Sequence, residues 1–322
     1  MKLNLSKMLF FNTMILGIIM SISSSNWILI WCGLEISLVS FIPLMISNKK
    51  MSSEATMKYF IIQSISSAML MLGMLIMIMK GDYNYDYILT TAILIKMGVV
   101  PFHNWVLTVA EGMEMVTMMI LLTINKIAPL VIMTYLKTSF NVIVMMTVLA
   151  GSILSLNQNS IKKMIAYSSI FNMGFILSVI KLNMLWMLYL MFYSMMMFML
   201  MNILTINNSN FVNQMTMSET IINKMSIWMM LLSLGGMPPM IGFYTKYLVM
   251  TFMVEMKMIL LLMIMVMSSL MIMFMYLRMT FMSIMVYSSQ TKIKLFNLNE
   301  MSYWTITLNL LLLPILFLTK TI

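Results

Sequence analysis

Apolar runs long enough to cross roughly 30 Å of hydrocarbon recur along this chain from residue 8 to residue 319. Of its 322 residues, 62% are apolar and only 9% are charged, against about 25% charged residues in ordinary soluble domains. The mean hydropathy of +0.99 is equally high. We therefore expect an all-α fold, a polytopic transmembrane helical bundle in which residues 1–322 form a single transmembrane domain. No length remains for a soluble catalytic domain.

The polar breaks between these runs predict about eleven helices. They are expected near residues 8–24, 27–46, 55–79, 87–109, 115–136, 139–156, 160–180, 183–206, 223–253, 257–282 and 303–319. An odd number of spans places the two termini on opposite sides of the membrane. The loop lysines on the N-terminal side are then Lys2, Lys7, Lys49, Lys50, Lys162, Lys163, Lys224, Lys292 and Lys294, and those on the other side are Lys80, Lys137, Lys181, Lys257 and Lys320. Nine lysines against five favour an N-terminus on the positive-inside face, in the cytoplasm or the mitochondrial matrix.

Two of the predicted helices contain residues that break a helix. Gly98 and Pro101 follow Lys96 in the fourth, and the segment 234–239 (LGGMPP) precedes Lys246 in the ninth. Unwound backbone at membrane depth is tolerated only where it is buried in protein or lines a wet cavity. The two breaks lie five spans apart, which predicts antiporter-like inverted five-helix repeats over residues 8–136 and 139–282, with 303–319 as an additional helix.

Four ionisable residues fall well inside apolar runs, and they are the main candidates for function. They are Glu35, Lys96, Lys126 and Lys246. Each costs at least about 2.5 to 3.5 kcal/mol to insert, so a function or a strong pairing must retain them. The alternatives are structural: a carboxylate bonded to a neighbouring helix, a lysine bonded to a carbonyl freed by Pro129, or a lysine that snorkels to the surface.

A buried glutamate and lysine together form a proton switch. Desolvation favours the neutral amine, whereas an approaching carboxylate favours the ammonium. At about 4 Å and an effective dielectric near 20 the pair is worth about 4 kcal/mol, which is enough to drive a step against the roughly 2.3 kcal/mol per charge of a 100 mV potential. His103, the only histidine, follows Pro101 and is a possible relay between Lys96 and loop water, or else a packing residue.

Other functional classes find no support in the sequence. The net charge of +10 comes from lysines scattered between apolar runs, so we expect no nucleic-acid partner. The single cysteine, Cys32, excludes an intrachain disulfide and any multi-cysteine metal site. P-loop, HExxH, GxSxG and dinucleotide signatures are absent, so we expect no cofactor or redox site in this chain. The N-terminus lacks the features of a signal or transit peptide.

Several segments together resemble one known family, subunit 2 of mitochondrial NADH:ubiquinone oxidoreductase (respiratory complex I), particularly in its insect-like forms. They are Gly33-Leu34-Glu35, Ser52-Ser53-Glu54-Ala55, 93–105 (ILIKMGVVPFHNW), 126–129 (KIAP), 156–169 (LNQNSIKKMIAYSS) and 232–246 (LSLGGMPPMIGFYTK). The chain departs from the family pattern at Leu107, at Ile124-Asn125 in place of Trp-Gln, and around Lys246. These departures change local hydrogen-bond partners and leave the charged residues in place.

The resemblance implies an antiporter-like subunit that translocates protons along a mid-membrane charged axis, coupled to electron transfer in other subunits. It implies that Glu35 is the coupling glutamate, Lys96 its partner, Lys126 the central relay and Lys246 the exit-side lysine. NADH, FMN, iron–sulfur clusters and ubiquinone would then belong to other subunits. The implied partners are the other membrane-arm subunits of complex I and phospholipids such as cardiolipin, and the implied location is the mitochondrial inner membrane with a matrix N-terminus.

Two alternative functions stay open on the sequence. A free-standing cation/proton antiporter shares the buried charges and the broken helices. A non-conducting structural membrane subunit would keep the same charges merely paired.

Overall fold

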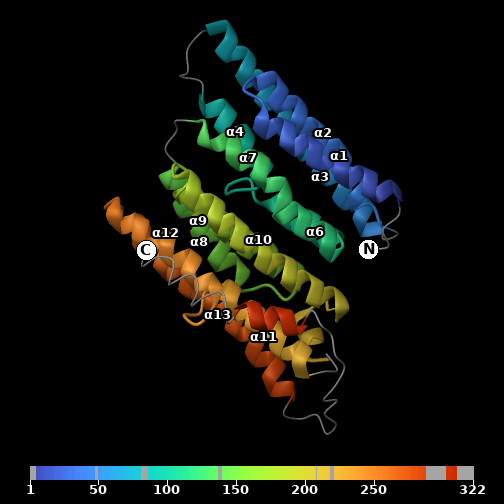
Figure 1. Ribbon diagram of the computed structural model, residues 1–322, viewed down its shortest axis with the longest axis vertical. Helices are drawn as coiled ribbons and strands as arrows, with labels where there is room; N and C mark the ends of the chain where they lie inside the picture. Colours follow the sequence, from blue (N-terminus) through green and yellow to red (C-terminus); the bar gives the residue numbers. More distant parts are fainter. Residues whose placement is uncertain are drawn as a thin grey trace. The chain divides into compact units, whose positions relative to one another are not determined.

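The chain is helical throughout the part that the structure describes. The computed structural model describes residues 5–47, 50–80, 86–136, 140–207, 209–217, 221–287 and 302–309. Outside helices and turns, these residues form only an isolated antiparallel bridge between Ser160 and Phe211. The all-α prediction is confirmed for these residues. Two compact units, residues 1–143 and 144–322, divide the chain (Figure 1). The inverted symmetry of the two repeats stays a prediction.

Unit 1 is built from three long helices and two interrupted ones. They are α1 (Leu5–Ser23), α2 (Trp27–Met45), α3 (Lys50–Lys80), α4 (Asp86–Met97), α5 (Asn104–Gly112), α6 (Met115–Leu122) and α7 (Ile124–Thr134). Figure 1 shows α1, α2 and α3 side by side, and α2 contacts both others. Helices α4 and α5 pack on α3, while α7 contacts α1, α4 and α6.

Small residues set the spacing between α1 and α2. A Cβ on Gly33 would lie 2.7 Å from both the carbonyl oxygen of Gly17 and the backbone nitrogen of Ser21. Close backbone approach of this kind is a common mode of helix packing in membranes, where lipid removes the hydrophobic drive between helices. Glu35 lies about half a turn beyond Gly33 on α2, so this close contact with α1 fixes the position of Glu35 along the helix pair.

Unit 2 is organised around one buried helix. It contains most of α8 (Asn141–Ser155), then α9 (Ile161–Ser178), α10 (Asn183–Ile206), the 3-10 segment η2 (Val212–Met217), α11 (Ile221–Gly235), α12 (Ile241–Glu255), α13 (Ile259–Tyr287) and a helix over residues 302–309. Nearly every residue of α9 is buried. Helix α9 contacts α10 and α12, and Gly151 of α8 lies against Phe171 of α9.

Six helices in the described residues are long and apolar enough to cross a membrane by length and composition. They span Leu5–Ser23, Trp27–Met45, Lys50–Met79, Met115–Thr134, Met184–Ile206 and Ile259–Phe281. Large apolar side chains such as Leu16, Met187 and Phe274 are exposed on them, which lipid would cover. The number of membrane-crossing helices, about eleven, stays a prediction.

Most predicted boundaries lie within a few residues of the observed ones, with the following differences. The third helix begins at Lys50 instead of residue 55, and the tenth predicted helix ends at Tyr287 instead of residue 282. The run 115–136, predicted as one helix, is interrupted at Thr123, whose hydroxyl donates to the carbonyl of Met119 at 2.7 Å. A threonine bonded back to its own helix often bends it. Of the predicted final helix, 303–319, only the part up to residue 309 lies in the described residues.

Candidate functional site

The predicted break in the fourth apolar run lies between α4 and α5, and Gly98 forms it. Gly98 has a φ of +68°, which an L-residue rarely adopts. Its N–H donates to the carbonyl of Ile95 at 3.1 Å, and the N–H of Val99 donates to that of Leu94 at 3.2 Å. This is the Schellman pattern of a helix end. Lys96 is therefore held in the last turn of α4.

Side chains from two other helices complete the end of α4. The Nε1–H of Trp105, on α5, donates to the carbonyl of Ile95 at 3.0 Å. The Nε2–H of Gln63, on α3, donates to the carbonyl of Lys96 at 3.3 Å. The Lys96 carbonyl, which the break leaves without a backbone partner, is thus satisfied by a side chain, and the Ile95 carbonyl accepts a second hydrogen bond besides the one from Gly98.

Glu35 and Lys96, both among the described residues, lie near each other in unit 1, with no ion pair between them. Lys96 is only 8% exposed, and Glu35 on α2 is half-buried. The Glu35 carboxylate is close enough to act electrostatically on both Lys96 and the hydroxyl of Tyr59, on α3. One carboxylate oxygen of Glu35 is buried without a hydrogen-bond partner among the described residues. The structure therefore places the predicted glutamate and its predicted partner lysine within electrostatic range.

Lys126 lies on α7, just after the interruption at Thr123. It is 4% exposed, and its Nζ is buried without a hydrogen-bond partner among the described residues. The amide Nδ2 and Oδ1 of its neighbour Asn125 are also buried without a hydrogen-bond partner among the described residues. An unpaired buried ammonium is expensive, so the arrangement favours a neutral amine or an additional ligand. Pro129, one turn later, remains inside α7.

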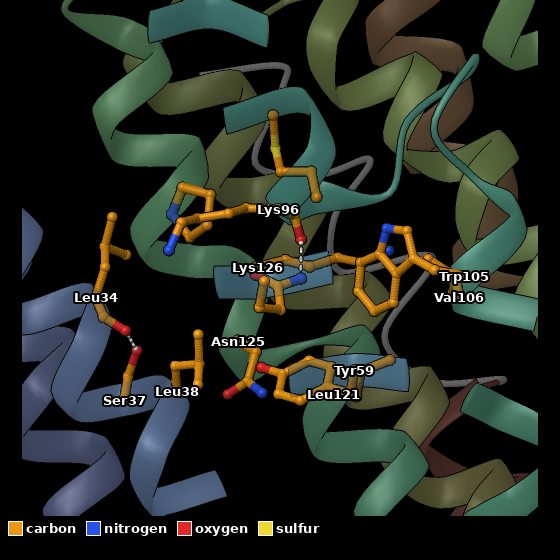
Figure 2. A pocket seen from close by; sticks show the side chains of 13 residues that line it. Leu34, Ser37, Leu38, Tyr59, Lys96, Trp105, Val106, Leu121, Asn125 and Lys126 are labelled. Carbon is orange, nitrogen blue, oxygen red and sulfur yellow. Dashed lines mark hydrogen bonds between the residues drawn. The ribbon is translucent and has the colours of Figure 1, made fainter. Parts of the chain in front are cut away.

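A small cavity of about 30 Å³ within unit 1 is lined by Lys96 and Lys126, whereas Glu35 is not among its lining residues. Figure 2 shows side chains from α2, α3, α4, α5, α6 and α7 around it. Its polar lining comprises Ser37, Tyr59, Gln63, Lys96, Trp105, Asn125 and Lys126. Lys96 and Lys126 thus face one polar space although they are thirty residues apart in sequence.

His103 lies at the start of α5 and is partly buried, with its Nδ1 buried and without a hydrogen-bond partner among the described residues. It is not among the residues that line the cavity. The structure therefore does not bring His103 into the group formed by Lys96 and Lys126, and its relay role stays a prediction.

The second predicted break, between α11 and α12, lies in unit 2 and carries Lys246. Gly236 has a φ of +85°, its N–H donates to the carbonyl of Ser233 at 3.0 Å, and the N–H of Met237 donates to that of Leu232 at 3.1 Å. Lys246, on α12, is 5% exposed. It reaches back to the end of α11.

The contacts of the Lys246 ammonium are specific. Its Nζ donates to the carbonyls of Gly235 at 2.7 Å and Leu234 at 3.2 Å. It also lies 5.4 Å from the ring centroid of Phe171 on α9, within the range of a cation–π interaction. A cation at the carboxyl end of a helix is stabilised by the helix dipole. Lys246 is thus buried against the end of α11, and its role in the break stays a prediction.

The sequence does not single out several residues of the site, among them Ser37, Tyr59, Gln63, Asn125 and Phe171. Gln63 interrupts an otherwise apolar stretch of α3, and a polar amide there is a signal for helix–helix hydrogen bonding. Asn125 was noted only as a departure from a family pattern. Nothing in the sequence marks Phe171 among the other apolar residues of α9.

The arrangement suits proton transfer between side chains and offers no metal site. Within the described ranges, no group of three or more histidine, cysteine, aspartate or glutamate residues could hold a metal ion. Unit 1 instead provides a carboxylate, two amines and two amides around or near one cavity.

Comparison with known proteins gives consistent similarities. Residues 24–272 match the family described as "NADH:quinone oxidoreductase/Mrp antiporter, TM". The NADH-ubiquinone oxidoreductase chain 2 of Anopheles gambiae is 38% identical over 273 residues, which cover 79% of each chain. That of Locusta migratoria is 33% identical over 300 residues, 89% of this chain and 88% of the relative. A chain of respiratory complex I from Thermus thermophilus has a similar fold, with a TM-score of 0.79, 19% identity, and coverage of 96% of this chain and 78% of that one.

Proposed function

Because this chain belongs to the NADH:quinone oxidoreductase/Mrp antiporter transmembrane family, we propose that it is an antiporter-like, proton-translocating subunit of NADH:ubiquinone oxidoreductase. Electron transfer takes place in other subunits, which hold NADH, FMN, iron–sulfur clusters and ubiquinone. The chain works in the mitochondrial inner membrane with its N-terminus in the matrix, beside the other membrane-arm subunits and phospholipids such as cardiolipin.

The observation that carries this proposal is the convergence of buried ionisable groups in unit 1. Glu35 acts electrostatically on Lys96, and Lys96 shares a cavity with the unpaired amine of Lys126. When Glu35 couples to Lys96, the ammonium form of Lys96 is favoured; when they uncouple, desolvation favours release of the proton toward Lys126. Lys246 serves as the corresponding exit-side group in unit 2, and His103 as an entry relay from loop water.

Energies of the right size support this cycle. Making or breaking a Glu–Lys pair at about 4 Å changes the energy by about 4 kcal/mol at an effective dielectric near 20. Moving one charge through 100 mV requires about 2.3 kcal/mol. A single pairing event is therefore large enough to move a proton against a typical membrane potential.

Glu35→Gln and Lys96→Met test the proposal in the assembled complex. Both side chains keep most of their volume while losing their titratable group, so we expect assembly close to normal and a lower proton-to-electron ratio in energised membrane vesicles. Lys126→Met provides a third variant of the same series. Met133→Leu is the matched apolar control, because Met133 is equally buried on α7 and does not line the cavity. A normal ratio in all three lysine and glutamate variants would reject a conducting role and leave the structural subunit.

A free-standing cation/proton antiporter is the second candidate, since the family description itself includes Mrp antiporters. Copurification separates the two candidates. The chain should be recovered with flavin- and iron–sulfur-containing proteins and with NADH:ubiquinone activity. Recovery only with antiporter-like subunits, together with sodium-dependent proton exchange, would favour the antiporter.

A further inference from the structure

The cavity of unit 1 is polar, and its size matches water. Its volume of about 30 Å³ leaves room for about one or two water molecules. Its lining offers hydrogen-bond groups from four helices, with Tyr59 and Gln63 on α3, Lys96 on α4, Trp105 on α5, and Asn125 and Lys126 on α7. A buried water normally makes two to four hydrogen bonds, and this lining supplies more than that number.

Three buried atoms on the wall of the cavity need partners that the described residues do not supply. They are the Nδ2 and Oδ1 of Asn125 and the Nζ of Lys126. Other polar groups of the wall are already engaged: Ser37 donates to the carbonyl of Leu34, Gln63 to that of Lys96, and Trp105 to that of Ile95. Nearly all buried polar groups in proteins are hydrogen-bonded, so these three atoms indicate a ligand that both donates and accepts.

We infer that the cavity binds one or two water molecules and that Asn125 is the residue that positions them between Lys96 and Lys126. Water accepts from the Nδ2–H of Asn125, donates to its Oδ1, and bonds to Lys126 Nζ. The amide takes no proton itself. It fixes the orientation of the water, because an amide presents a donor and an acceptor about 2 Å apart on a side chain that packing holds in place. This inference rests on the proposed function, since it specifies how the proton passes between two of its lysines.

The transfer step balances without any further reactant. An N–H bond of protonated Lys96 breaks as an O–H bond forms on water. An O–H bond of the same water, or of the second one, breaks as an N–H bond forms at neutral Lys126. One proton has moved and the water is unchanged. Two ammonium groups repel each other, so only one lysine is charged at a time and an intervening water replaces a direct contact.

The test compares variants of Asn125 in the assembled complex. Asn125→Leu keeps the size of the side chain and removes both polar atoms, so proton pumping per electron should fall and its initial rate should drop roughly tenfold. Asn125→Gln retains the amide and should recover much of the rate. The solvent deuterium isotope effect on pumping should change in Asn125→Leu and return toward normal in Asn125→Gln, which a purely structural role would not produce.

The matched control is Thr123→Val. Thr123 lies between α6 and α7, and this change also replaces a buried polar side chain by an isosteric apolar one. The Thr123 hydroxyl is bonded to Met119, and Thr123 does not line the cavity. Normal pumping in both Asn125→Leu and Thr123→Val, with pumping still lost in Lys126→Met, would overturn the water-positioning inference and leave the proposed function standing. Normal pumping in Lys126→Met, Lys96→Met and Glu35→Gln as well would reject the proposed function.

A second measurement decides the question even where Asn125→Leu fails to assemble. A cryo-EM map of the unmodified complex, at a resolution that reveals ordered water, should contain density within hydrogen-bond distance of Asn125 and Lys126. Such density supports the inference. A cavity without it, or one filled by a rearranged side chain, overturns it.

Discussion

Replacing Gly236 with alanine is expected to disrupt the broken helix of unit 2, whereas the same change at its neighbour Gly235 is not. Gly236 has a φ of +85°, and alanine in that left-handed region costs about 1 to 2 kcal/mol. The new Cβ would also lie 2.9 Å from the Cδ and 3.1 Å from the Nζ of Lys246. Crowding a packed site typically costs a further 1 to 3 kcal/mol, so the total is about 2 to 5 kcal/mol.

The Gly236→Ala change also affects the contacts of the Lys246 ammonium, because the Lys246 side chain must move to make room for the new Cβ. Its Nζ would then leave the carbonyl of Gly235, at 2.7 Å, or that of Leu234, at 3.2 Å. Gly235 is helical, and a Cβ there would meet nothing closer than 3.5 Å, an ordinary contact with Tyr276. Alanine at 235 should therefore be neutral or gain up to about 1 kcal/mol from its higher helix propensity.

The assay is the fraction of assembled complex that survives a graded heat challenge on a native gel, followed by proton pumping in the surviving fraction. Gly236→Ala should survive at lower temperatures and pump less, while Gly235→Ala should match the unmodified complex. Equal behaviour of the two variants would refute the reasoning from backbone conformation and from the contact with Lys246.

Two further predictions follow from packing in unit 1. Gly33→Ala should separate α1 from α2, because its Cβ would lie 2.7 Å from the Gly17 carbonyl oxygen and the Ser21 nitrogen. The loss of stability, about 1 to 3 kcal/mol, should appear as reduced accumulation of the subunit on immunoblots. Normal accumulation would contradict this prediction. Trp105→Phe should retain the ring against Tyr59 but lose the bond to the Ile95 carbonyl, so stability to heat should fall by about 1 kcal/mol or more, and an unchanged thermal profile would show that this bond is dispensable.

Hydropathy predicts where most of the described helices of this chain lie, because a membrane imposes a similar length and polarity on each span, whereas the number of spans stays a prediction. The breaks at Gly98 and Gly236 are predictable for a related reason, since glycine followed by proline in an apolar run has few other structural outcomes. The interruption at Thr123 is not predictable in this way. A threonine bonds back to its own helix in many unbroken helices too, so its bend depends on what packs around α6 and α7.

In the candidate site, too, some residues are predictable from the sequence and others are not. Burying a charge in lipid is costly enough that Glu35, Lys96, Lys126 and Lys246 stand out from composition alone. Their partners do not. The donation from Gln63 to Lys96 joins α3 to α4, and the cation–π contact of Lys246 joins α12 to α9, and such pairings between helices depend on tertiary packing that periodicity does not reveal.

The two breaks share the geometry of their helix end. Gly98 and Gly236 both have positive φ and both end their helices by the Schellman pattern. A proline follows three residues later in each case, at Pro101 and Pro239. In each, the N–H four residues after the glycine donates to the carbonyl one residue after it, at 2.7 Å and 2.9 Å. The two breaks therefore share their helix end and the hydrogen bond that follows it, whereas the prolines differ, since the Val100–Pro101 peptide bond is cis and no cis bond is present among the described residues of the second break.

The lysines do not occupy equivalent positions in that shared turn. Lys96 precedes its glycine by two residues, whereas Lys246 follows its glycine by ten and reaches back across the break. Yet both belong to the carboxyl end of the first half-helix, Lys96 as part of its last turn and Lys246 through the carbonyls of Leu234 and Gly235. What the two units have in common is thus a cation at the negative end of a half-helix dipole, where partial charges of the backbone favour the ammonium and partly offset its burial. In the function that we propose, such a site holds a proton without a permanent carboxylate partner, so the group is free to release it.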